Sequence, residues 1–203
     1  NTGAGSNGVS LTTAGAITVN NSITTTTGAS GGGVAFSNGG LLTINGNIVS
    51  DGAVAQTGAG LVSITSPRSI TTTGDAVGFA TGVTLNGAGT TSIDTTAGPT
   101  LAGNNITFGS TLTGTTSGVE NLMVNAGTGG TVLFTGTVGA TRLGDIVITN
   151  GNNVTESAGI TAKSLTQVAG TNTGTTLLTG AVDTSGNTGA GSNGVSLTTA
   201  GAI

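Results

Sequence analysis

The stretch GVSLTTAGAITVNNSIT, residues 8–24, alternates apolar residues with small polar ones in three short runs separated by Gly, Asn or Ser. Alternation with a period of two predicts β-strands, because successive side chains of a strand point to opposite faces. Gly and Asn accept the positive φ of sharp corners, so they suit the positions between strands. The branched side chains expected to point inward are Val9, Leu11, Ile17, Val19 and Ile23. The stretch therefore predicts one coil of strands around a narrow apolar core.

The pattern recurs about every 23 residues, in steps that range from about 19 to about 28 residues. Each recurrence begins with an apolar-x-apolar run such as GVSL, GVAF, LVSI, GVTL, NITF or TVLF. The first apolar positions of these runs are Val9, Val34, Val62, Val83, Ile106, Val132, Val154, Thr176 and Val195. About eight such steps precede Val195, and we expect the extra residues of the longer steps to lie in corner loops, such as GASGGGVAF at residues 28–36.

A second segment, rich in Ile and Thr, follows the first in many steps. It reads NSITTTTG at residues 21–28, RSITTTGD at 68–75 and TSIDTTAG at 91–98, with a looser version, GAVDTSG, at 180–186. A third segment is DGAVAQTG from Asp51, which matches DAVGFATG from Asp75. Each step thus offers two or three short strands.

A repeat of this length predicts a stacked architecture. The chain has no sustained 3.6-residue period and very few Glu and Lys residues, which argues against helical repeats. The fold class we predict is therefore all-β, a parallel β-helix (β-solenoid) of about eight coils. With strands stacked about 4.8 Å apart, eight coils form a rod roughly 38 Å long.

A longer repeat is superimposed on the short one. The sequence NTGAGSNGVSLTTAGAI occupies residues 1–17 and again residues 187–203, so Asn1 recurs as Asn187 after 186 residues. We expect residues 1–186 to be one complete solenoid unit and residues 187–203 to begin the next identical tandem copy, within a longer protein. The two GVSL strands are then expected at equivalent points of adjacent copies.

Composition restricts the chemistry that the chain can perform. Its 40 Gly residues could indicate disorder, but a mean hydropathy of +0.30 and a net charge of −4 argue for an ordered chain. The chain has no Cys for disulfides and no His for acid–base catalysis or metal binding. With three basic residues and no run of about 20 apolar ones, neither a nucleic-acid partner nor a membrane span is expected.

The segment NITFGSTLTGTTSGVENLMVNAGTGGTVLFTGTVGATRLGDIVITN, residues 105–150, resembles the repeats of giant bacterial surface proteins of the filamentous-haemagglutinin and autotransporter-adhesin type. In such repeats, strands of the form VxF or LxVNAG alternate with GTVGAT-like turns, and the Thr- and Gly-rich style of the whole chain is similar. The resemblance implies a right-handed helix, secretion from a Gram-negative cell, and a role in surface fibres, adhesion or biofilm matrix. It implies no particular binding residue.

The acidic residues are the first candidates for a site. They are Asp51, Asp75, Asp94, Glu120, Asp145, Glu156 and Asp183. Some β-helical enzymes cleave polysaccharides with clustered carboxylates and a basic residue, and Asp75 and Asp94 could lie on neighbouring coils with Arg68 close to Asp75. The alternative is that these charges are scattered at corners and keep the chain soluble, and we expect that alternative, with no catalytic, cofactor or metal site.

Two other residue types form candidate rows. The tracts Thr24–Thr27, Thr71–Thr73 and Thr95–Thr96 could form an ice-binding array, although unequal steps would interrupt it, and a Thr-rich solvent face is the simpler interpretation. Phe36, Phe108 and Phe134 share one position of the first strand and are expected to stack inside the coil rather than to form a ligand-binding row.

The function expected from these features is structural: a repeat of a long extracellular fibre or adhesin stalk whose partners are identical repeats stacked end to end. The first alternative is an adhesive module that binds a glycan or ice. The second is a polysaccharide-degrading enzyme, which the missing His and Tyr make the weaker expectation.

Overall fold

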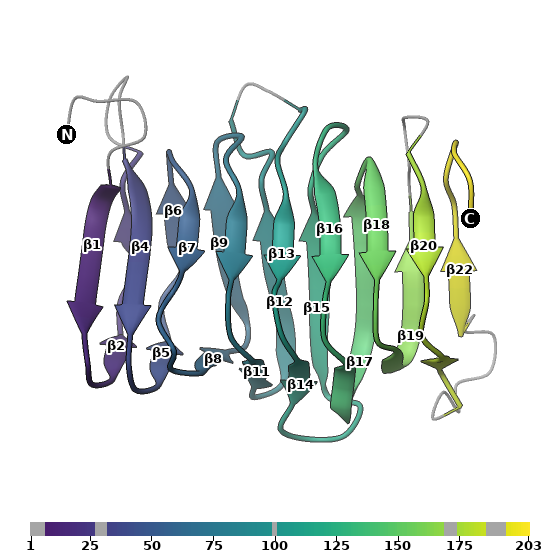
Figure 1. The fold of residues 1–203 in the computed structure, drawn as a ribbon, viewed down its shortest axis with the longest axis horizontal. Helices are drawn as coiled ribbons and strands as arrows, with labels where there is room; N and C mark the ends of the chain where they lie inside the picture. The colour runs from purple at the N-terminus through teal and green to yellow at the C-terminus, as the bar shows by residue number, and fades with distance from the viewer. Residues whose placement is uncertain (1–6, 27–31, 99–100, 169–173, 186–193) are drawn as a thin grey trace.

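The chain folds as a β-solenoid in which each turn contributes three short strands, one to each of three faces (Figure 1). The computed structural model describes residues 7–26, 32–98, 101–168, 174–185 and 194–203, and these residues contain no helix. In Figure 1 face 1 is toward the viewer, face 2 lies along the lower edge and face 3 lies behind. The predicted corner at residues 28–36 falls partly outside the described residues, which resume at Gly32.

The strands are grouped here by face. Face 1 consists of β1 (Asn7–Thr13), β4 (Gly33–Asn38), β7 (Val54–Gln56), β10 (Val77–Phe79), β13 (Ile106–Phe108), β16 (Thr131–Phe134), β18 (Asn153–Glu156) and β20 (Thr176–Leu178). Face 2 consists of β2 (Ile17–Val19), β5 (Leu42–Ile44), β8 (Val62–Thr65), β11 (Val83–Asn86), β14 (Leu112–Gly114), the first parts of β17 (Val138–Asn150) and β19 (Ile160–Gln167), and β21 (Val182–Asp183). Face 3 consists of β3 (Ile23–Thr24), β6 (Ile48–Ser50), β9 (Arg68–Thr72), β12 (Gly89–Asp94), β15 (Glu120–Asn125), the second parts of β17 and β19, and β22 (Val195–Leu197).

All strand pairs are parallel, and each strand pairs with the strand one turn before it and one turn after it. β17 and β19 continue around the corner between faces 2 and 3, which joins those two faces into one sheet. Face 1 contains eight strands, so Val9 and Thr176, which occupy equivalent positions, are seven turns apart. Their 167-residue separation corresponds to about 24 residues per turn, which confirms the predicted solenoid and its period.

Two of the predicted first-strand positions were wrong. Val62 and Val83 lie in β8 and β11 on face 2, whereas the face-1 residues of those turns are Val54 and Val77. The third segment recognised in the sequence, at DGAVAQTG and DAVGFATG, is thus the true face-1 strand. The same apolar-x-apolar pattern serves all three faces, because every strand has one inward and one outward side.

Two predictions near the C-terminus were also wrong. GAVDTSG was matched to the Ile- and Thr-rich strands of face 3, but Val182 pairs with Ile160 on face 2. The second GVSL was expected on face 1 beside β20. It forms β22, which pairs with β19 on face 3.

Inward side chains stack into columns that run the length of the rod. One column on face 1 contains Val9, Val34, Val54, Val77, Ile106, Val132, Val154 and Thr176. The next contains Leu11, Phe36, Gln56, Phe79, Phe108, Phe134, Glu156 and Leu178. Away from the two ends these side chains are almost completely buried, and each buried branched residue contributes roughly 1.5–3 kcal/mol.

The predicted Phe stack is present but has different members. Phe108 stacks on Phe134, with ring centroids 5.3 Å apart, and on Phe79, with centroids 5.8 Å apart. Phe79 was missed because it lies in the segment that was not assigned to face 1. Phe36 shares the column but is separated from Phe79 by Gln56.

Corners with positive φ are formed by Gly alone among the described residues, whereas Asn was also expected there. At Gly139, where φ is 82°, an added Cβ would lie 1.9 Å from the carbonyl oxygen of Thr161 on the next turn. The corner Asn residues instead connect turns through their side chains. Asn45 donates to Asn20 at 3.1 Å and accepts from Thr65 at 2.7 Å.

Candidate functional site

The two ends of the solenoid are the first candidate for function, because each ends in strand edges that no described strand covers. β1, β2 and β3 are the terminal strands at one end of their faces, and β20, β21 and β22 are terminal at the other. The outer edge of a terminal strand presents N–H and C=O groups without a ladder partner, which favours pairing with another strand. Each end can therefore accept a further turn.

The end formed by β1 and β2 is hollowed. The hollow has a volume of about 380 Å³ and is lined by Ser10, Leu11, Thr12, Thr13, Ala16 and Ile17. Leu11 is the first member of the Phe-containing column, and its side chain is 38 % exposed, whereas Phe36 on the next turn is 1 % exposed. The hollow is therefore the place where the apolar core reaches solvent.

The opposite end also exposes its columns. Leu178, Val182 and Leu197 are only partly buried and pack against the core from the last turn, and Val195 is 44 % exposed. Both ends thus combine an open strand edge with apolar side chains. These are the two properties that a stacked neighbour would satisfy at once.

Face 2 carries a second candidate, a regular array of polar side chains. Its outward residues on five consecutive turns form one row of Thr18, Thr43, Ser63, Thr84 and Thr113. Two residues further along each strand lie Asn20, Asn45, Thr65, Asn86 and Thr115. Side-chain hydrogen bonds connect turns within this second row, so the two rows form a regular surface of hydroxyl and amide groups.

The Thr tracts named in the sequence do not form such an array. On face 3 Thr24 pairs with Val49, Val49 with Thr71, and Thr71 with Asp94, so the row alternates in residue type. Thr72 and Thr95 are buried, and Thr27 lies outside the described residues. The regular Thr row is on face 2, where single Thr residues, rather than tracts, recur in register.

The carboxylates do not gather into a catalytic cluster. In the described part of the chain no three acidic side chains lie close enough together to hold a metal ion. Arg68 donates to the backbone carbonyls of Asn45 and Pro67 rather than to Asp75, and Asp94 accepts from the backbone and hydroxyl of Thr96 at 2.7 Å each. Burial and the nearby Asp51 carboxylate raise the pKa of Asp75.

Two acidic residues expected at the surface are completely buried. Glu120 accepts hydrogen bonds from the hydroxyl of Thr115 at 2.7 Å and from the backbone of Thr116 at 3.1 Å. Glu156 occupies the Phe-containing column and accepts from the backbone N–H groups of Ala158, Gly159 and Gly180. Both carboxylates satisfy donors at corners of the coil, which is a structural role.

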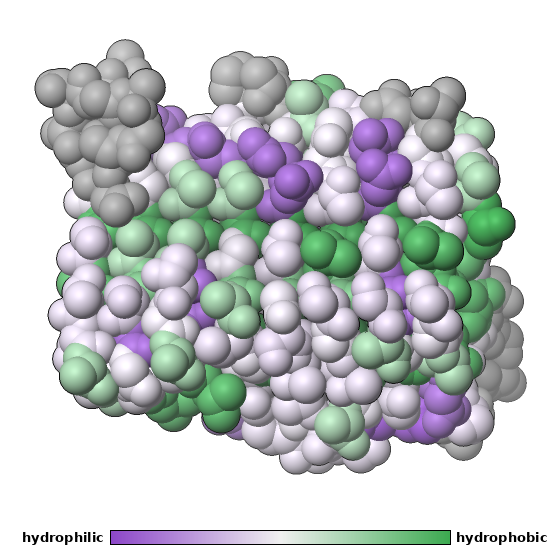
Figure 2. Space-filling view, viewed as in Figure 1, coloured by the Kyte–Doolittle hydropathy of each residue, from purple (hydrophilic) through white to green (hydrophobic). Residues whose placement is uncertain are grey.

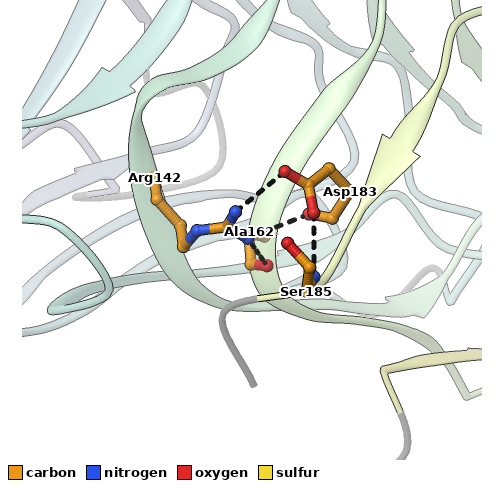
Figure 3. Close-up of polar contacts among 4 residues, drawn as sticks. All are labelled: Arg142, Ala162, Asp183 and Ser185. Carbon is orange, nitrogen blue, oxygen red and sulfur yellow. Dashed lines mark hydrogen bonds and ion pairs between the residues drawn. The ribbon is translucent and has the colours of Figure 1, made fainter. Parts of the chain in front are cut away.

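Arg142 connects three successive turns near the C-terminal end (Figure 3). From β17 its guanidinium donates to the carbonyl of Ala162 in β19 at 2.8 Å, and to the carbonyl and carboxylate of Asp183 in β21 at 3.1 and 2.8 Å. This is the one ion pair within the described residues. Hydrogen bonds from the side chain and backbone of Ser185, followed by that from Arg142, lower the pKa of Asp183 to about 2.

Arg142→Ala should raise the pKa of Asp183 but leave it below its ordinary value of 3.8, because the larger contribution, from Ser185, persists. The carboxylate favours folding above pH 4, and this contribution is lost as the pH falls through about 2. An NMR titration of the Asp183 carboxyl measures both effects. Ser185→Ala is the matched control and should raise the pKa further, and an unchanged pKa in both variants would contradict the assignment.

The surface as a whole is weakly charged. Figure 2 shows a mostly neutral surface with few strongly hydrophilic residues and a hydrophobic band that runs lengthwise across the face seen in Figure 1. Among the described residues, no helix has the length and apolar character needed to span a membrane. No family model, curated protein or solved structure matches the chain.

Proposed function

We propose that this chain is a structural unit of a long extracellular bacterial fibre or adhesin stalk, which elongates when units stack end to end. One observation carries the proposal: the sequence that begins the solenoid recurs at residues 187–203, and its strand β22 continues the parallel ladder of β19. A unit that ends by extending its own ladder with its own starting sequence is suited to linear repetition. The resemblance of residues 105–150 to repeats of bacterial surface proteins supports the extracellular location.

The chemistry of the rod also suits a fibre. Stability is distributed along repeated inward columns, and the ladder needs no metal or disulfide because the backbone groups of neighbouring turns pair with one another. The described carboxylates are dispersed or used to complete corners, as shown above for Glu120 and Glu156. These features support a structural role over catalysis.

The test is a charge placed at the open end. In Leu11→Lys the ammonium group lies in the hollow where the next unit would stack, so burying it costs several kcal/mol. We expect the unchanged chain to form rods that lengthen with concentration, and the variant to associate at least about 100-fold more weakly. Sedimentation and electron microscopy measure both.

Leu61→Lys is the matched control. Leu61 is 60 % exposed and precedes β8 on the side of the rod, away from both ends, so its replacement should leave association unchanged. A chain that stays monomeric at millimolar concentration, or assembly that Leu11→Lys does not weaken, would overturn the proposal.

The face-2 array favours a second candidate function, binding to a regular hydroxylated surface such as a polysaccharide or ice. Thr43 and Thr84 lie in one row on alternate turns, and replacing both by Lys should abolish retention on such a surface while leaving the fold intact. Thermal hysteresis and binding to a panel of polysaccharides are the measurements. If neither detects binding by the unchanged chain, this candidate is wrong.

A further inference from the structure

The same sequence occupies two different faces of the solenoid. In the first copy, GVSL lies in β1, and its Val9 and Leu11 begin two inward columns of face 1. In the second copy, GVSL forms β22, and its Val195 and Leu197 continue two inward columns of face 3 beyond Leu165 and Gln167. The residues that point inward are thus the same in both copies, although the face has changed.

The residues that follow are displaced in the same way. In the first copy, the Ile of GAI is Ile17, which begins β2 on face 2. In the second copy, the carbonyl of Ala202 accepts a hydrogen bond from Thr176 on face 1 at 2.9 Å, just as Thr175 accepts one from Val154 one turn earlier. Ile203 therefore follows at the first inward position of face 1, and the displacement by one face persists along the described part of the second copy.

We propose that a second copy of the unit joins the first rotated by one face, about a third of a turn, about the long axis of the rod. From β1 to β22 the chain passes seven full turns and two further faces, so one unit makes 7⅔ turns. Three units then make 23 turns and restore the original orientation. This inference rests on the proposed function, since it describes how tandem units join.

The rotation is maintained because each turn stacks on the turn before it. Within a unit, β4 pairs with β1 and β5 with β2, and a second copy with the same sequence forms the same pairs. Once its GVSL strand lies on face 3, its next turn lies there too. The first turn of the new copy covers the ends of β19, β20 and β21, where Leu178 and Val182 are only partly buried.

The rotation determines how the fibre displays its surface. The polar array of face 2 extends over five turns of a unit, and in the next unit it would lie a third of a turn away. A fibre built in this way presents the array to all sides in sequence, rather than as one long line. A surface feature of one unit therefore becomes a helical feature of the fibre.

Cysteine pairs can test the placement of the second copy on the chain itself. Thr166 and Ser196 are outward-facing partners in the rotated arrangement, on neighbouring strands about 4.8 Å apart, which suits a disulfide. In an unrotated arrangement Ser196 would take the place that Ser10 has on face 1 and would lie beside Leu177, the last outward residue of that row. The pairs Thr166→Cys with Ser196→Cys and Leu177→Cys with Ser196→Cys therefore distinguish the two arrangements.

We expect dilute oxidation to close the first pair nearly completely within one chain and to leave the second pair reduced. Ser10→Cys with Ala35→Cys, partners in β1 and β4, is the positive control for folding and oxidation. Closure of the Leu177 pair, of both test pairs, or of the control alone would overturn the rotated arrangement. The reading is intramolecular, so it is independent of whether the units form a fibre.

A chain extended by a second full copy provides a second measurement. With turns about 4.8 Å apart, 7⅔ turns correspond to a rise of about 37 Å per unit with a rotation of about 120° in addition to the intrinsic twist of the solenoid. An unrotated junction of eight whole turns would rise about 38 Å with no added rotation. Helical reconstruction from electron micrographs separates the two by the rotation.

Discussion

Replacing Glu156 by Ala is expected to lower the free energy of unfolding by about 3–5 kcal/mol, because three buried backbone donors lose their acceptor. The carboxylate is completely buried in the Phe-containing column. One oxygen accepts from the N–H groups of Ala158 and Gly159, and the other accepts from Gly180 on the next turn at 3.0 Å. The substitution also leaves a cavity between Phe134 and Leu178, which adds to the loss.

Glu156→Gln is the matched control, because it retains the volume and one acceptor oxygen. Its amide group faces backbone donors, so we expect an intermediate loss of about 1–3 kcal/mol. Urea unfolding measures the totals, and hydrogen exchange at Gly159 and Gly180 locates the effect. A loss below 1 kcal/mol in Glu156→Ala would show that the carboxylate does not complete this corner.

The buried carboxylate illustrates what the register adds to the sequence. NVTE follows the apolar-x-apolar spacing with Glu156 at the second inward position, the place that Phe134 occupies one turn earlier. That signal was visible in the sequence, but acidity favoured a corner at the surface. Gln56 is the same case: it takes the inward position between Phe36 and Phe79, where its amide donates to Asn38 and Gly58.

The solenoid itself could be predicted because its cause is local. Alternation predicts strands, Gly-rich corners end them, and a period near 23 residues sets the turn. The face of a given strand could not be predicted, since LVSI on face 2 and GVAF on face 1 satisfy the same inward and outward requirements. This equivalence of the faces is also what allows one GVSL sequence to form β1 on face 1 and β22 on face 3.

The functional surfaces were predicted in part for the same reason. Open strand edges follow from any solenoid, so stacking of units was expected from the fold class alone. The array on face 2 requires the register, because Thr18, Thr43 and Thr84 are separated by unequal numbers of residues. The ladder, rather than the sequence spacing, aligns them.

Replacing Phe108 by Ala is expected to lower the free energy of unfolding by about 4–7 kcal/mol, the combined effect of a cavity of about 3–5 kcal/mol and two aromatic contacts of about 0.5–1.5 kcal/mol each. Phe108 is fully buried and stacks on Phe79 and Phe134. Its ring lies nearly parallel to that of Phe134, with an interplanar angle of 9°. It is therefore the central member of the stack.

The column contains its own graded controls, because its four Phe residues are buried alike but differ in ring partners. Phe79 and Phe134 each have one aromatic partner, and Phe36 has Leu11 and Gln56 as its column neighbours. We expect the Ala variants to lose stability in the order Phe108, then Phe79 and Phe134, then Phe36, with steps of about 0.5–1.5 kcal/mol. Urea unfolding monitored by circular dichroism measures the series. Equal losses at Phe36 and Phe108 would mean that burial alone, without ring stacking, accounts for the stability of the column.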